Sequence, residues 1–135
     1  MTKKIISTSD APAAIGPYSQ AILAGDTLYC SGQIAINPST GELVLDSIQT
    51  ETEQVMKNIK AVLKAAEMDL SNVVKCTIFM SSMEHYGDIN TVYAAYFSEN
   101  PPAREAVAVK TLPKEVNVEI SVVDRKSTRM NSSNS

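Results

Sequence analysis

The sequence predicts an α+β fold in which two helices cover one face of a mixed β-sheet. Three observations lead to this prediction. Short strand-like runs gather at both ends of the chain, two segments with helical spacing of apolar residues lie between them, and one continuous apolar run separates these two segments. Helices that alternate with single strands, flanked by hairpins, are typical of such sheets. The expected order is β-β-β-α-β-α-β-β.

The first three strands are expected near residues 4–7, at 19–24 and at 27–34. Gly25 and Asp26 separate the second run from the third, and a two-residue connection of this type favours a tight β-hairpin. The segment that follows, residues 37–41, is rich in turn-forming residues and predicts an exposed loop.

The first helix is expected to begin with a capping box at residues 50–53, Thr-Glu-Thr-Glu. Apolar residues then repeat at helical spacing for about four turns, while lysines occupy the other positions. Residues 73–80 are almost continuously apolar and predict a central strand covered on both faces. The second helix is expected to start near Ser81 or Ser82 and to end before Asn100-Pro101-Pro102, because proline cannot continue it.

The last two strands are expected at residues 103–109 and 116–123, joined as a hairpin. Side chains alternate along a strand, so each run has one valine-rich face. If these faces match across the hairpin, Arg104 and Glu119 point to the same side of the sheet. Two interpretations of this pair stay open. It is either a cross-strand ion pair, or a site in which Arg104 binds a carboxylate ligand while Glu119 handles a proton or a water.

Length and composition fit one domain: the chain has 135 residues, of which 44% are hydrophobic and 20% charged. We expect this domain to span residues 1–123. Residues 124–135 are polar, and we interpret them as a non-native or naturally disordered tail. Without the tail the chain has 9 Lys and Arg against 14 Asp and Glu, and Arg104 is its only arginine. This acidic balance argues against a nucleic-acid partner.

Several other classes of site find little support. His85 is the only histidine, and the five glycines form no phosphate loop or dinucleotide motif. Cys30 and Cys76 lie in strand-like runs without closely spaced Cys or His ligands, so we expect no zinc site, and the lack of glycine motifs argues against a nucleotide cofactor. No run approaches the roughly 18 apolar residues of a membrane helix, and the first seven residues are too short for a signal peptide. We therefore expect a cytoplasmic protein without a membrane partner.

Four motifs together resemble the RidA/YjgF family of reactive-intermediate deaminases. They are residues 11–21 (APAAIGPYSQA), residues 31–33 (SGQ), residues 102–104 (PAR) and residues 112–120 (LPKEVNVEI). The resemblance implies a chorismate-mutase-like fold and a homotrimer with active sites between subunits. It also implies hydrolysis of 2-imino or 2-enamino acids, such as 2-iminopropanoate and 2-iminobutanoate, to 2-oxo acids and ammonia without a metal or an organic cofactor.

The same resemblance implies roles for individual residues. Arg104 would bind the substrate carboxylate, Glu119 would position or activate water, and Tyr18 would line the cleft and hydrogen-bond the ligand. Further residues would shape the substrate site: Ser31, Gly32, Asn90 and Ala106. Ala106 departs from the family pattern, which often has cysteine at this position. Two alternatives stay open, a non-enzymatic carboxylate-binding or holdase-like protein and, ranked lower, an RNA-directed ribonuclease.

Overall fold

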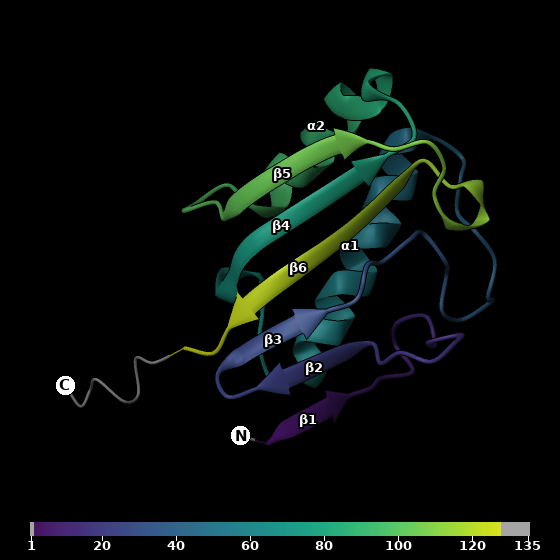
Figure 1. The fold of residues 1–135 in the computed structure, drawn as a ribbon. Helices are drawn as coiled ribbons and strands as arrows, with labels where there is room; N and C mark the ends of the chain where they lie inside the picture. Colours follow the sequence, from purple (N-terminus) through teal and green to yellow (C-terminus); the bar gives the residue numbers. More distant parts are fainter. Residues whose placement is uncertain (1, 128–135) are drawn as a thin grey trace.

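The computed structural model describes residues 2–127 (Figure 1). Its strands are β1 (Lys3–Ile6), β2 (Ala21–Ala24), β3 (Thr27–Cys30), β4 (Val73–Met80), β5 (Ala103–Ala108) and β6 (Val118–Arg125). Its α-helices are α1 (Ile48–Ala65) and α2 (Tyr86–Tyr96), and single 3-10 turns precede β4, α2 and β6. The expected order of strands and α-helices is confirmed.

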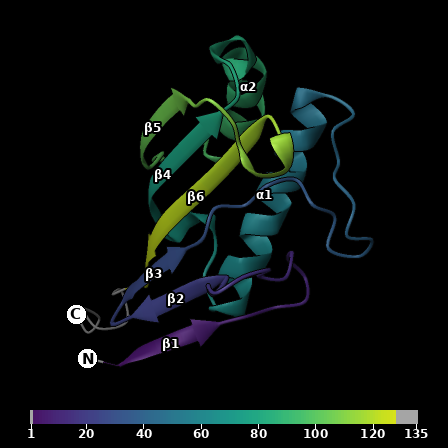
Figure 2. The same cartoon turned by 45° about the vertical axis from the view of Figure 1, so that its right-hand side comes forward.

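The six strands form one mixed sheet with the order β1-β2-β3-β6-β4-β5. The pair β4–β5 is parallel, and the other neighbouring strands are antiparallel. Both views of the ribbon show α1 and α2 on the same side of the sheet (Figures 1 and 2). The predicted α+β fold, with its mixed sheet and two helices on one face, is therefore confirmed.

The expected hairpin between the last two strands is wrong. Strand β4 lies between β5 and β6, pairing with β5 in parallel and with β6 in antiparallel orientation. The reason is the path of the chain: α2 connects β4 to β5, and a helical crossover between neighbouring strands produces a parallel pair. The final strand then returns along the other edge of β4. Which side chains share a face of the sheet changes accordingly.

Helix α1 begins three residues earlier than expected. Its N-cap is Ser47, whose Oγ accepts a hydrogen bond from the backbone N–H of Thr50 at 3.0 Å. The predicted capping box at residues 50–53 is therefore wrong: Thr50 is not the N-cap, and Glu53, which would have closed the box, accepts a hydrogen bond from the Tyr96 hydroxyl group. Glu51 lies in the first turn of α1. Its carboxylate is fully buried and accepts hydrogen bonds from the backbone N–H groups of Asn117 and Val118 and from the Asn117 side chain. Glu51 thus ties α1 to the start of β6.

The hydrophobic core lies between the helices and the sheet. The apolar face of α1 is fully buried, with Val55, Ile59 and Leu63 at 1% exposure or less, whereas its lysines are exposed. On the sheet, alternate residues of β4 and β6 face the helices: Cys76, Ile78, Met80, Val118, Ile120 and Val122. This alternation assigns the intervening residues of both strands to the helix-free face.

Strand β6 extends to Arg125, two residues past the expected strand and into the segment interpreted as a tail. Asp124 is fully buried in this extension. The remainder of the expected tail from residue 128 onward lies outside the described residues. Within residues 2–127, no helix has the length and apolar character needed to cross a membrane.

Candidate active site

Arg104 lies on the edge strand β5, with its side chain directed toward α2. Its half-buried guanidinium donates two hydrogen bonds, from Nη1 to Asn90 Oδ1 at 2.8 Å and from Nη2 to Tyr86 Oη at 2.6 Å. Its Cζ atom lies 4.9 Å from the centroid of the Tyr93 ring and 5.6 Å from that of Tyr86. Three side chains of α2 therefore hold this guanidinium in place.

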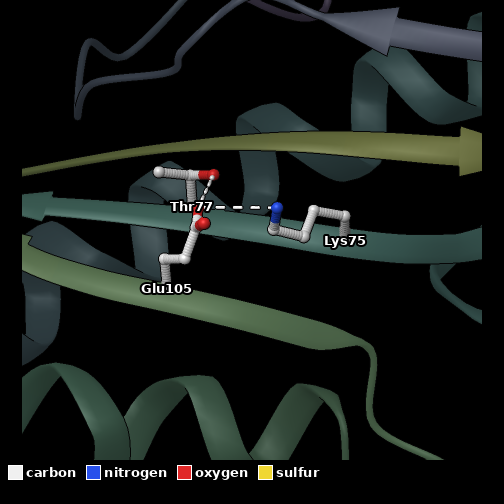
Figure 3. Close-up of polar contacts among 3 residues, drawn as sticks. All are labelled: Lys75, Thr77 and Glu105. Atoms are coloured by element: carbon white, nitrogen blue, oxygen red, sulfur yellow. Dashed lines mark hydrogen bonds and ion pairs between the residues drawn. The ribbon is translucent and has the colours of Figure 1, made fainter.

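The charge of Arg104 has no carboxylate partner within residues 2–127. The ion pair found there joins Lys75 and Glu105, at 3.5 Å, and Glu105 also accepts a hydrogen bond from Thr77 (Figure 3). Glu105 follows Arg104 in the chain but points to the opposite face of the sheet. Because Asn90 and the tyrosines are neutral, they orient the guanidinium without cancelling its charge. The arrangement favours binding of an anion.

Glu119 lies on β6 and points away from the helices. Burial raises the pKa of its carboxyl group above the usual range. Gly32 lies directly against it: a Cβ atom added to Gly32 would come within 2.0 Å of Glu119 Oε2 and 2.8 Å of its Cδ. The room for this carboxylate therefore depends on the absence of a side chain at residue 32.

Residues 31–33 were expected to continue the third strand, but β3 ends at Cys30. The chain then rejoins the sheet only through the bridge between Gln33 and Ile120, whose two backbone hydrogen bonds measure 2.8 and 3.1 Å. Between these points, the Ser31 hydroxyl donates to the backbone carbonyl of Ser19 at 2.6 Å. The bridge brings Gly32 against Glu119.

A cavity of about 580 Å³ opens beside Glu119. Its polar lining consists of Tyr18, Gln20, Ser31, Gln33, Lys114 and Glu119, and the other walls are mainly apolar, including Ile15, Ile34 and Pro113. Tyr18 is 54% exposed, so it is available at the rim and does not cap the core. The cavity has room for a small ligand, which the polar side chains of the lining could hydrogen-bond.

The expectation that Arg104 and Glu119 share a side of the sheet is wrong. Cys76 of β4 is paired with both Arg104 and Val122, which places Arg104 on the helix-covered face, whereas Glu119 is paired with Phe79 on the helix-free face. The expectation failed because it assumed a direct β5–β6 hairpin.

The predicted site residues consequently form two groups. The cavity brings together Tyr18, Ser31, Gly32 and Glu119. The other group surrounds β5 and α2: Arg104 contacts Asn90, and Ala106 is half-buried beside the core, paired with Ile78. Within residues 2–127, no three His, Cys, Asp or Glu side chains form a group that could hold a metal ion.

Tyr86 was not singled out from the sequence, although a signal for it existed. Tyr86, Asn90 and Tyr93 are spaced four and three residues apart, which places them on one face of a helix. Asn90 had been named on resemblance alone, and the helical spacing would have added the two tyrosines beside it. Their contact with Arg104 required the strand order to be known.

Comparison with known proteins gives consistent relationships. The family model described as Endoribonuclease L-PSP matches residues 8–125. A "Putative regulator AldR" of Lactococcus lactis is 52% identical over 120 residues, covering 89% of this chain and 95% of the relative. The 2-iminobutanoate/2-iminopropanoate deaminase of Rattus norvegicus is 47% identical over 121 residues, covering 90% of this chain and 88% of that protein.

A solved structure shows the same fold. The crystal structure of a putative endoribonuclease from Thermotoga maritima superposes with a TM-score of 0.91 at 46% identity, covering 93% of this chain and 99% of the other. The relatives bear different functional names, regulator, deaminase and endoribonuclease, so the comparisons establish the family and leave the activity to be argued from the site. The chain belongs to the Endoribonuclease L-PSP family, also called the RidA/YjgF family.

Proposed function

We propose that this protein hydrolyses reactive 2-imino and 2-enamino acids to 2-oxo acids and ammonia. The observation that carries the proposal is the unneutralised guanidinium of Arg104, held by neutral side chains of α2. A planar guanidinium of this kind binds a carboxylate through two parallel hydrogen bonds. The deaminase name of the rat relative supports a substrate that contains such a carboxylate.

Arg104 has enough free donors for this task. A guanidinium carries five N–H groups, and Asn90 and Tyr86 accept one hydrogen bond each. Three N–H groups are left for a ligand. Binding the carboxylate would fix the position of the adjacent imine carbon and so reduce the entropic part of the barrier to hydrolysis.

Glu119 is proposed to move the protons. As a carboxylate it takes a proton from water while the water oxygen bonds to the iminium carbon and the C=N π pair moves to nitrogen. Glu119 then returns this proton to the nitrogen of the carbinolamine. The C–N bonding pair leaves with ammonia, and the hydroxyl group gives its proton to Glu119 as the C=O bond forms. The raised pKa of Glu119 favours this role, because it makes the carboxylate a stronger base. Tyr18 and Ser31 line the same cavity and are placed to hydrogen-bond the ligand.

We further propose that two copies of the chain complete each site within a homotrimer. Arg104 and Glu119 lie on opposite faces of one sheet, so a single chain does not bring them to one ligand. The helix-free face also carries exposed apolar side chains, among them Ile5, Tyr29 and Val107. Such a surface favours burial against another copy. In this arrangement, Arg104 of one copy faces the Glu119 cavity of the next.

The proposed chemistry does not require a covalent nucleophile at residue 106. An iminium carbon is already electrophilic, so positioned water and a fixed carboxylate are sufficient to accelerate hydrolysis. Ala106 supplies only its backbone groups and a methyl group. We therefore expect deaminase activity without a thiol at this position.

The test is a hydrolysis assay with 2-iminopropanoate and 2-iminobutanoate generated enzymatically, with uncatalysed hydrolysis as the baseline. We expect acceleration by the wild-type protein and loss of at least about tenfold in kcat/KM for Arg104→Lys, because lysine does not form the bidentate contact. Arg125→Lys is the matched control, since Arg125 is exposed at the end of β6. Absence of acceleration by the wild-type protein would refute the proposal, and binding of 2-oxobutanoate without acceleration would favour a carboxylate-binding protein.

A further inference from the structure

The Tyr86 hydroxyl accepts a hydrogen bond of 2.6 Å from Arg104 Nη2. We propose that Tyr86 is a positioning residue for Arg104. Its hydroxyl fixes the plane in which Arg104 presents its free N–H groups to the substrate carboxylate. The inference rests on the proposed function, since it assumes that Arg104 binds the substrate carboxylate. It adds a residue that touches Arg104 and acts on the ligand through it.

Two acceptors on different nitrogens determine the orientation of a guanidinium. Asn90 alone would hold Nη1 and leave the group free to turn about that contact. Tyr86 holds Nη2 as well, so the two hydrogen bonds together define the guanidinium plane. The two residues are separated by one helical turn and share a face of α2, which makes the acceptor pair a rigid unit. Such restraint reduces the entropy lost on binding a ligand.

The neutrality of the acceptor matters as much as its position. A carboxylate in place of the Tyr86 hydroxyl would also fix Arg104, but it would neutralise the charge and compete with the substrate for the same N–H groups. A phenol accepts the hydrogen bond while leaving the positive charge available. No Asp or Glu within residues 2–127 forms an ion pair with Arg104, so its positive charge is available to bind an anionic ligand.

The hydroxyl of Tyr86 can be tested separately from its ring. The ring centroid lies 5.6 Å from Arg104 Cζ, and phenylalanine would keep this contact. Tyr86→Phe therefore removes one hydrogen bond from Nη2 and nothing else of comparable size. Because Arg104 is only half-buried, water can replace the lost acceptor, and we expect the variant to fold.

The experiment measures the affinity of wild-type protein and variants for 2-oxobutanoate by calorimetry, followed by steady-state kinetics with 2-iminobutanoate. For Tyr86→Phe we expect the dissociation constant and KM to rise about tenfold, in line with the loss of a hydrogen bond to a charged group. We expect kcat to change less than KM, because water attack and proton transfer lie with Glu119. Thermal unfolding should show a melting temperature close to that of the wild-type protein.

Tyr96→Phe is the matched control. The Tyr96 hydroxyl also belongs to α2 and also makes a hydrogen bond, at 2.5 Å, but its acceptor is Glu53 on α1. Its loss should leave the affinity for 2-oxobutanoate unchanged. A second comparison places Tyr86→Phe in an Arg104→Lys background. There the substitution should have little effect, because the guanidinium group that the Tyr86 hydroxyl positions is absent.

The outcomes separate this inference from the proposed function. Wild-type binding and hydrolysis combined with an unchanged affinity in Tyr86→Phe would overturn the positioning role alone. An equal loss of affinity in Tyr96→Phe would also overturn it, because the effect would then belong to the helix and not to the hydroxyl. If the wild-type protein neither binds 2-oxobutanoate nor accelerates hydrolysis, the proposed function and this inference both fail.

Discussion

Arg104 and Glu119 leave the sheet on opposite faces, although only strand β4 separates the strands that carry them. Arg104 lies against α2, and Glu119 lies against Gly32 in the lining of a cavity. A catalytic pair on opposite faces of one sheet can act on one ligand only if different copies of the chain supply its members. This relationship leads to the first prediction.

Two inactive variants should restore activity when they are combined. We expect Arg104→Ala and Glu119→Gln each to abolish most deaminase activity, and mixed trimers formed by co-refolding to regain it. In a ring of randomly mixed subunits, roughly a quarter of the interfaces combine an intact Arg104 with an intact Glu119. The rate of the mixture should therefore approach roughly a quarter of the wild-type rate. Mixing without refolding is the control, and a mixture that stays inactive after refolding would argue for a site within one chain.

Gly32→Ala should impair catalysis by displacing Glu119. The added Cβ atom would lie 2.0 Å from Glu119 Oε2, so the carboxylate must move. We expect a loss of about 100-fold in kcat, comparable to the effect of misplacing a catalytic group by about 1 Å. Gly87→Ala is the matched control, because a Cβ atom there meets nothing within 4 Å and the helix should tolerate it. Wild-type kcat in Gly32→Ala would mean that the position of Glu119 does not limit the reaction.

Glu51→Gln should destabilise the fold more than Glu53→Gln, although both residues belong to α1. The Glu51 carboxylate is fully buried and accepts three hydrogen bonds from Asn117 and Val118, and a glutamine amide group would face these donors with donors of its own. We expect a loss of about 2–4 kcal/mol in the free energy of unfolding. Urea unfolding measures it. Equal losses in the two variants would contradict the importance of this anchor.

Asp124 should make the protein less stable as pH rises. Its carboxyl group is fully buried, Oδ2 has no hydrogen-bond partner in the described residues, and the contact of Oδ1 is the weak donor Cys30 Sγ at 3.9 Å. Burial raises the pKa of Asp124 from 3.8 to about 7. The folded state therefore holds this proton more tightly than the unfolded chain does. The associated stability is present below about pH 4 and is lost as pH rises through about 7.

Melting temperatures of the wild-type protein and Asp124→Asn between pH 5 and pH 8 check this prediction, with several degrees of difference expected at the upper end. Asparagine carries no charge, so the melting temperature of the variant should not decline with pH in this way. At the higher pH it should exceed the melting temperature of the wild-type protein. Asp10→Asn is the control, because Asp10 is exposed. Parallel curves of melting temperature against pH for the wild-type protein and Asp124→Asn would show that the pKa of Asp124 is the same in the folded and unfolded states.

Local patterns were sufficient for most secondary structure. Residues 73–80 form β4 with the expected bounds, and the turn at Gly25 and Asp26 joins β2 to β3 as expected. The apolar spacing predicts helix α1, but the helix starts three residues before the predicted capping box because Ser47, and not Thr50, is its N-cap. Glu51 in its first turn is bound by Asn117, which lies 66 residues away. A contact of that separation leaves no local signature in the sequence.

The sequence by itself determined the order of the elements, the family motifs and the residue types available for chemistry, because turn residues and side-chain periodicity act over a few neighbouring positions. Only the tertiary structure decided where these groups point. Insertion of β4 between β5 and β6 placed Arg104 against α2 and Glu119 beside Gly32. Alternation along a strand fixes side chains relative to one another, but the pairing of distant strands depends on how the helices pack against the whole sheet.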